Sequence, residues 1–280
     1  PPPPPPPPPF IMLPRPPRTT LIRSRRQRQM CIRDRGEPIA FLNGVLMTVD
    51  SWKLQTLEIS QRFRCIMHDF RGQLRSSKPD QPWTLEDHSN ELKALLDHLG
   101  IDSCHLVGTS YGGEVGMVFA ATWPERVRSL TVIASVSEVG PDTERTVLEW
   151  RRAALEEPFS LYRTMLPTTF SPQFVAANPG LIKLGEERLK SCEEDFFKSF
   201  AGLIDAFCEL DITSSLSKVR CPALVIAGEK DLLKPPRYSQ IIADGIAGSE
   251  LLVVPGAGHA VVLEQPEWVN RKVIDFVDRH

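Results

Sequence analysis

The strongest chemical signal in the sequence is a G-x-S-x-G motif that places Ser110 between Gly108 and Gly112. An apolar run precedes the motif and an apolar helical pattern follows it, so we expect a strand, a tight turn and a helix. A serine at such a turn is strained, and its neighbours must be almost without side chains, a need that glycine meets. The turn lifts the hydroxyl clear of the sheet, where a base can reach it. Ser110 is therefore predicted to be a nucleophile.

A serine nucleophile needs a base, and the base needs an acid that orients it. His259 lies in a glycine-rich loop after the last predicted strand, and Asp231 follows the strand before that one. Both stand at carboxyl ends of predicted parallel strands, where open α/β sheets place their sites. Taken alone, Asp231 could cap a helix and His259 could be an ordinary loop histidine. The chain order Ser110, Asp231, His259 favours a catalytic triad, with Glu138 as the rival acid.

The other five histidines fit the role of the base less well. His88 and His98 lie on an amphipathic helix, where solvation is the simpler explanation, and His68 and His105 lie within predicted strands. His280 is the last residue of the chain.

Short apolar runs alternate with helical patterns along most of the chain. Strands are expected at 39–42, 64–68, 105–107, 130–134, 223–227 and 251–254, and helices at 85–99, 113–122 and 267–277, with a weaker helical pattern at 49–59. Apolar strands that alternate with helices predict an α/β fold with a mostly parallel sheet and helices on both faces.

Residues 139–218 interrupt this alternation, because they are helical in pattern and contain no convincing strand. They hold nine of the 21 aromatic residues. We expect them to form a helical lid over an apolar pocket, inserted before the last two strands of a core made of residues 36–138 and 219–280. An ordinary hydrophobic helical subdomain is the alternative.

Residues 1–35 differ in composition from the rest of the chain. They begin with nine prolines and carry eight arginines against one acid. Such a segment offers no apolar face to bury, so it is expected to be a disordered leader, and residues 25–35 resemble translated non-coding sequence. A nucleic-acid or nuclear-import patch is the alternative. The apolar stretch 10–13 is too short for the core of a signal peptide, about 7–15 residues.

Composition narrows the function classes further. The formal net charge of −2 gives no case for nucleic-acid binding, and no apolar run reaches the roughly 18 residues of a membrane helix. Six scattered cysteines without a CxxC pair indicate reduced thiols of a cytoplasmic protein. Neither a phosphate-binding loop, a dinucleotide fingerprint nor an HExxH zinc helix occurs, so no cofactor and no metal are expected.

From Glu37 to the C-terminus the chain resembles the α/β-hydrolase superfamily, in particular its lid-bearing esterase and enol-lactonase-like serine hydrolases. The motifs that carry the resemblance are the serine motif and the stretches FLNG (41–44), DFRG (69–72), WPERV (123–127), AGEKD (227–231) and PGAGH (255–259). The resemblance implies an oxyanion hole formed by the backbone N–H groups of Val45 and Tyr111.

The chain departs from the family pattern in three places. Asn43-Gly44 stands where the family usually has His-Gly, and Gly72-Gln73-Leu74 where it has Gly-His-Gly. Neither change removes a catalytic group, and the Asn43 amide could hold the same loop. The family also opens with an antiparallel hairpin, whose place the leader occupies here, so we expect the sheet to lack its first two strands and to have an unprotected edge.

These observations predict a serine hydrolase, a monomer or homodimer, that cleaves a small carboxylic ester, lactone or thioester with an apolar body. A carbon–carbon bond hydrolase and a peroxidase-type enzyme use the same triad and remain alternatives. A ligand-binding or signalling protein that keeps the fold is a third, because a fold does not determine a function.

Overall fold

Eight strands form one sheet in the computed structural model, which describes residues 20–21, 30–32, 36–74, 76–79 and 82–280. Their order across the sheet is β1-β2-β4-β3-β5-β6-β7-β8. The strands are β1 (Thr20–Leu21), β2 (Met30–Ile32), β3 (Pro38–Leu42), β4 (Arg64–His68), β5 (Cys104–Thr109), β6 (Val127–Ile133), β7 (Ala223–Gly228) and β8 (Glu250–Val254). The six strands from β3 to β8 run parallel, as predicted.

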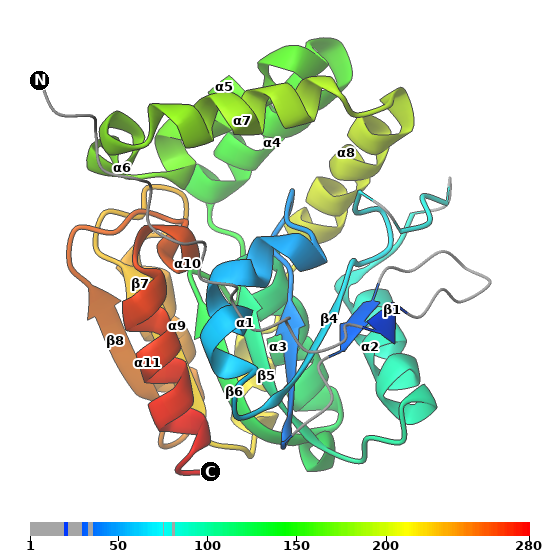
Figure 1. Ribbon diagram of the computed structural model, residues 1–280, viewed down its shortest axis with the longest axis vertical. Helices are drawn as coiled ribbons and strands as arrows, with labels where there is room; N and C mark the ends of the chain where they lie inside the picture. The colour runs from blue at the N-terminus through cyan, green and yellow to red at the C-terminus, as the bar shows by residue number, and fades with distance from the viewer. Residues whose placement is uncertain (1–19, 22–29, 33–35, 75, 80–81) are drawn as a thin grey trace, which may run out of the picture.

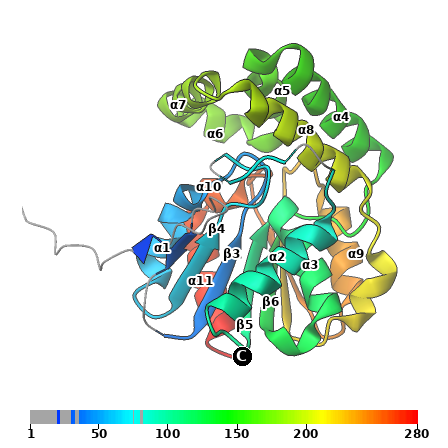
Figure 2. The same ribbon diagram turned by 90° about the vertical axis from the view of Figure 1, so that its right-hand side faces the viewer.

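Helices cover both faces of the sheet (Figures 1 and 2). One face carries α2 (Leu85–His98), α3 (Tyr111–Thr122) and α9 (Pro236–Gly245), and the other carries α1 (Lys53–Ile59) and α11 (Pro266–Val277). Short helices complete the core: η1 (Val49–Trp52), η2 (Pro124–Arg126), η4 (Thr213–Lys218) and α10 (Val261–Glu264). The predicted mostly parallel sheet with helices on both faces is confirmed.

Residues of β3 alternate between the two cores, as the pleat of a strand requires. Ala40 and Leu42 pack with the α2 and α3 side, whereas Ile39 and Phe41 pack with the α1 and α11 side. All four are buried, which explains why this strand reads as a continuous apolar run.

The expected absence of the first two strands is wrong. β1 pairs antiparallel with β2, and β2 pairs antiparallel with β4 through Met30–His68, Cys31–Met67 and Ile32–Ile66. Strands this short leave almost no periodic pattern in a sequence. β2 nevertheless pairs with backbone N–H and C=O groups of β4 that would otherwise lie unpaired at the edge of the sheet. The predicted disorder does not hold for these two strands, and the rest of residues 1–35 lies outside the described residues.

A helical cap lies at one end of the sheet (Figures 1 and 2). It consists of α4 (Pro141–Glu156), η3 (Pro158–Ser160), α5 (Leu161–Thr169), α6 (Pro172–Ala177), α7 (Pro179–Lys190) and α8 (Glu194–Cys208). No strand occurs between residues 139 and 218, all of which are described, in agreement with the sequence pattern. Within the described ranges, no helix combines the length and the apolar character that spanning a membrane requires.

We predict that a variant lacking residues 1–35 is less stable than the whole chain, because it loses both β1 and β2 and exposes the edge of β4. Its melting temperature should fall by several degrees, at about 2–4 °C for each kcal/mol lost. Differential scanning calorimetry and light scattering measure the melting temperature and the expected self-association. A variant lacking only residues 1–18 keeps both strands and is the control. Equal stability of all three chains would contradict the assignment.

Candidate active site

Ser110 lies at the sharp turn between β5 and α3, with φ 52° and ψ −123°. A non-glycine residue with positive φ is strained, and the two glycines of the motif relieve crowding around it. A Cβ on Gly108 would lie 2.4 Å from the Gly112 carbonyl oxygen, and a Cβ on Gly112 would lie 2.0 Å from that of Leu42. The motif is therefore required by packing, as the sequence predicted.

The structure brings the three predicted residues together in one hydrogen-bonded chain. His259 Nε2 lies 3.0 Å from Ser110 Oγ, and His259 Nδ1 lies 2.8 Å from Asp231 Oδ2. The carboxylate can only accept, so Nδ1 carries the proton and Nε2 accepts from the serine hydroxyl. The backbone N–H groups of Leu233 and Lys234 donate to Asp231 Oδ1 at 2.9 and 2.8 Å, which holds the carboxylate in place.

Glu138, the rival acid, lies elsewhere. Its side chain is exposed and accepts a hydrogen bond from Thr213 Oγ1 at 2.9 Å, and its backbone forms an isolated bridge with Asp211. The group that contacts the histidine is therefore Asp231.

The backbone N–H groups of Val45 and Tyr111 have no hydrogen-bond acceptor among the described residues. These are the two residues that the family resemblance implies for an oxyanion hole. The loop that contains Val45 packs against the turn at Ser110, as the close approach of Gly44 shows: a Cβ added to Gly44 would lie 3.4 Å from Ser110 Cβ.

The two departures from the family motifs contact each other and hold this loop. Asn43 Nδ2 donates to Gln73 Oε1 and to Asp69 Oδ1, both at 3.1 Å, while Asn43 Oδ1 accepts from Trp52 Nε1 at 2.8 Å. Gln73 Nε2 then donates to the Gly44 carbonyl oxygen at 2.9 Å. Two buried amides thus fix the backbone next to Val45, in agreement with the role expected of Asn43.

Hydrogen bonds connect the cap to the residues directly before and after His259 in the chain. The N–H of Ala260 donates to the Thr169 carbonyl oxygen at 2.8 Å. The N–H of Gly258 donates to Glu264 Oε2 at 3.1 Å, and the same carboxylate accepts from the N–H and hydroxyl of Ser171 at 2.9 and 2.6 Å. Glu264 therefore joins the junction of α5 and α6 to the histidine loop.

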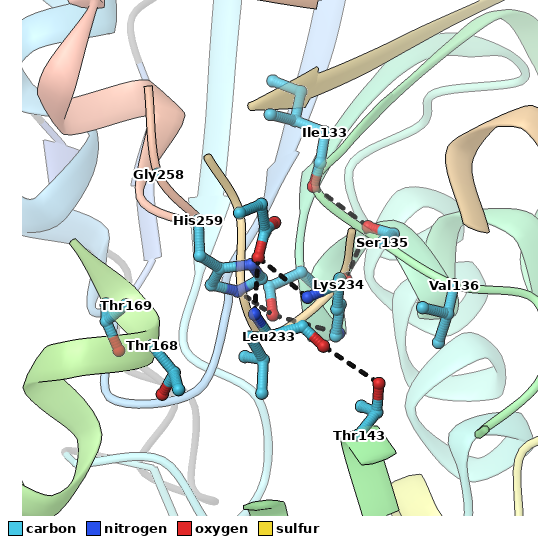
Figure 3. A network of polar contacts seen from close by, with 12 residues as sticks. Ile133, Ser135, Val136, Thr143, Thr168, Thr169, Leu233, Lys234, Gly258 and His259 are labelled. Carbon is cyan, nitrogen blue, oxygen red and sulfur yellow. Dashed lines mark hydrogen bonds and ion pairs between the residues drawn. The ribbon is translucent and has the colours of Figure 1, made fainter. Parts of the chain in front are cut away.

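A third attachment joins the cap to the aspartate loop. Thr143 Oγ1, from α4, donates to the Leu233 carbonyl oxygen at 2.9 Å, and Figure 3 shows it approaching that loop beside Lys234 and His259. The cap therefore contacts both loops that follow the last two strands.

A pocket of about 310 Å³ lies between the cap and the sheet and includes both Ser110 and His259. Most of its walls are apolar, and Arg188 is the charged side chain among the described residues that line it. The principal apolar lining residues are Val45, Leu46, Met47, Leu74, Trp150, Met165, Leu166, Phe170, Leu189, Phe196, Val262 and Leu263. A larger hollow of about 660 Å³ between α2, α4 and α8 contains none of the three predicted residues.

Comparison with known proteins agrees with this architecture. The model of the alpha/beta hydrolase fold family matches residues 37–266. The chain belongs to the α/β-hydrolase family.

Two curated relatives and one solved structure are similar over most of the chain. "Putative carbamate hydrolase RutD" of Caulobacter sp. (strain K31) is 29% identical over 81% of this chain and 85% of its own. 3-Oxoadipate enol-lactonase 2 of Acinetobacter baylyi is 27% identical over 84% of this chain and 86% of its own. A thermophilic esterase from Thermogutta terrifontis is 25% identical with a TM-score of 0.80, over 94% of this chain and 98% of its own. The chain is thus a hydrolase of this family.

Sequence reasoning missed two charged residues of this α/β-hydrolase that lie beside the serine. Lys234 Nζ lies 3.2 Å from Ser110 Oγ and 2.7 Å from Glu114 Oε1, and both charged side chains are buried. One signal was present, because Glu114 is the single charged residue of the otherwise apolar helix α3. A lone acid on a buried helix indicates a buried partner, but the sequence does not name that partner.

We predict that Glu264→Ala loosens the histidine loop, since it removes the acceptor shared by Gly258 and Ser171. A loss of about 2 kcal/mol, within the range for hydrogen bonds to a charged group, lowers the melting temperature by roughly 4–8 °C at this chain size. We also expect kcat/KM to fall on the order of tenfold, equivalent to about 1.4 kcal/mol. Thermal melts and steady-state assays measure the two effects. Glu267→Ala, which removes an exposed carboxylate nearby, is the matched control. Unchanged kinetics in the Glu264 variant would refute the coupling.

Proposed function

We propose that this protein is a serine hydrolase that cleaves a small carboxylic ester, lactone or thioester through an acyl-enzyme. Ser110 is the nucleophile, His259 the general base and Asp231 the residue that orients the imidazole. The observation that carries the proposal is the continuous hydrogen-bonded chain from Asp231 through His259 to Ser110 at the wall of an apolar pocket.

Acylation begins when Ser110 Oγ attacks the substrate carbonyl carbon while His259 Nε2 takes the hydroxyl proton. The carbonyl oxygen becomes an anion, and the N–H groups of Val45 and Tyr111 stabilise it, each by roughly 3 kcal/mol. The tetrahedral intermediate then collapses, and the leaving group departs with the proton from His259. Asp231 stabilises the imidazolium in between by accepting the hydrogen bond from Nδ1.

Deacylation repeats these steps with water. His259 Nε2 takes a proton from a water molecule, whose oxygen attacks the acyl carbon. The same two N–H groups stabilise the second oxyanion, and Ser110 Oγ leaves with the proton from the imidazolium.

The apolar pocket supports a substrate whose acyl part is hydrophobic. Aliphatic and aromatic side chains of the cap and of the Val45 loop line it. Burial of a hydrophobic acyl group against them would contribute roughly 25 cal/mol of binding free energy per Å² of apolar surface removed from water. The relatives named for an enol-lactone, a carbamate and an ester support chemistry at a carbonyl carbon. We further propose that helices α4 to α8 act as a lid over this pocket.

We predict that a fluorophosphonate probe labels the protein at one residue and that Ser110→Ala abolishes the labelling, because the probe reacts with an activated serine. Intact-mass spectrometry measures the added mass, and peptide mapping locates it. Ser217→Ala is a control, since that serine is exposed and its hydroxyl donates to the Ser214 carbonyl oxygen, away from the site. Labelling that survives Ser110→Ala would refute the assignment.

We predict that Asp231→Asn lowers kcat by a factor on the order of 10⁴, by analogy with the serine-protease triad, in which an asparagine stabilises the wrong histidine tautomer. Glu138→Gln should leave kcat nearly unchanged, because Glu138 contacts Thr213 instead of His259. Stopped-flow measurements with an activated ester give both rates. The opposite result, an unchanged kcat in the Asp231 variant and a strongly lowered kcat in the Glu138 variant, would assign the role of the acid to Glu138.

A further inference from the structure

A buried ion pair lies directly behind the proposed nucleophile. The Lys234 and Glu114 side chains are only 3% and 0% exposed, and Lys234 Nζ lies 2.7 Å from Glu114 Oε1. Glu114 Oε1 also accepts from the Val136 N–H at 3.0 Å. Neither charge takes part in the triad mechanism.

Stability alone is a weak reason for such a pair. Two charges that leave water lose solvation energy, and replacing a buried ion pair by apolar residues is often neutral or stabilising. Helix α3 is otherwise apolar, so a hydrophobic residue at position 114 would suit its packing. The contact that distinguishes this pair is the one to the serine, at 3.2 Å between Lys234 Nζ and Ser110 Oγ.

Two groups contact the Lys234 ammonium. Glu114 supplies the opposite charge, and the Phe207 ring from α8 lies 4.5 Å from Nζ, within the range of a cation–π contact. Burial raises the pKa of the Glu114 carboxyl, and the charge and hydrogen bond of Lys234 oppose that rise.

An ammonium has three donors and no acceptor, so Ser110 Oγ accepts the hydrogen bond from Lys234. The serine proton is then free to point at His259 Nε2, 3.0 Å away. Lys234 thus selects the hydroxyl orientation in which the proton can be transferred.

We propose that Lys234 is a further catalytic residue, an ammonium held by Glu114 that stabilises negative charge on Ser110 Oγ. In acylation, the Oγ–H bond breaks as the proton moves to His259 Nε2, and the ammonium stabilises the charge that develops on Oγ before its bond to the acyl carbon is complete. In deacylation, the bond between Oγ and carbon breaks, and the ammonium stabilises the departing oxygen until His259 returns the proton. Lys234 keeps all three of its protons throughout.

Glu114 has a second role, which is to balance the charge of Lys234. A cation next to the serine would by itself disfavour the imidazolium that forms on His259 during each proton transfer. The Glu114 carboxylate balances the charge of Lys234, so the pair as a whole is neutral while its hydrogen-bond donor still contacts Oγ. The inference rests on the proposed function, since it needs Ser110 to be the nucleophile.

The test compares Lys234→Met with the double variant Lys234→Met/Glu114→Gln. The double variant removes both charges, and the amide oxygen of the introduced glutamine can still accept from the Val136 N–H. Lys230→Met, which removes a lysine from the same loop whose side chain is 57% exposed, is the matched control. The rates measured are those of fluorophosphonate labelling, and of acylation and deacylation with a p-nitrophenyl ester.

We expect both Lys234 variants to be labelled and acylated about 10- to 100-fold more slowly, the factor that one hydrogen bond to a charged group supports. The dissociation constant of the ester, obtained from the concentration dependence of the acylation rate, should change by less than about twofold, because the lost contact is to the reacting oxygen and not to the substrate. The Lys230 variant should react at the wild-type rate.

Two results would overturn the inference. The first is a folded double variant that reacts at the wild-type rate, and the second is a folded Lys234→Met variant that does so; either one assigns the pair a structural role only. Failure of the proposed function is a separate outcome, because the wild-type protein would then not be labelled at Ser110 at all.

Discussion

The position of the whole site depends on the strained backbone conformation of Ser110. Its positive φ turns the chain from β5 into α3 within one residue. So sharp a turn brings backbone segments close together, and the residues on either side of Ser110 must leave room for them. Gly112 allows the Leu42 carbonyl to pack against the turn, and Gly113 leaves room for the Ser135 hydroxyl. That hydroxyl in turn donates to the Ser110 carbonyl oxygen at 2.9 Å. The surrounding sheet therefore holds a conformation that the local chain would not adopt alone.

Three loops meet at this turn, and each is held by polar contacts from a different part of the chain. Buried amides of Asn43 and Gln73 hold the Val45 loop, and two backbone N–H groups hold the Asp231 carboxylate. The histidine loop is joined to the cap through Glu264. The cap thus contributes to the geometry of the site as well as to the walls of the pocket.

The part of the fold that the sequence did not predict is the edge of the sheet formed by β1 and β2. The core strands from β3 onward are buried and apolar, and their pattern predicts them directly. β1 and β2 comprise two and three residues, too few for a periodic signal, and they lie in a segment dominated by proline and arginine. Their formation depends on the free edge of β4, a property of the assembled sheet.

Local sequence patterns were enough to predict the fold class, the turn at Ser110, and the aspartate and histidine at the ends of later strands. Strand ends, glycines and chain order can be read without knowing which side chains meet. The folded chain was needed to establish that Asp231 and not Glu138 contacts His259, and that Lys234 and Glu114, separated by 120 positions, meet behind the serine. Those contacts depend on how the loops and helices pack across the sheet, and no local pattern encodes that packing.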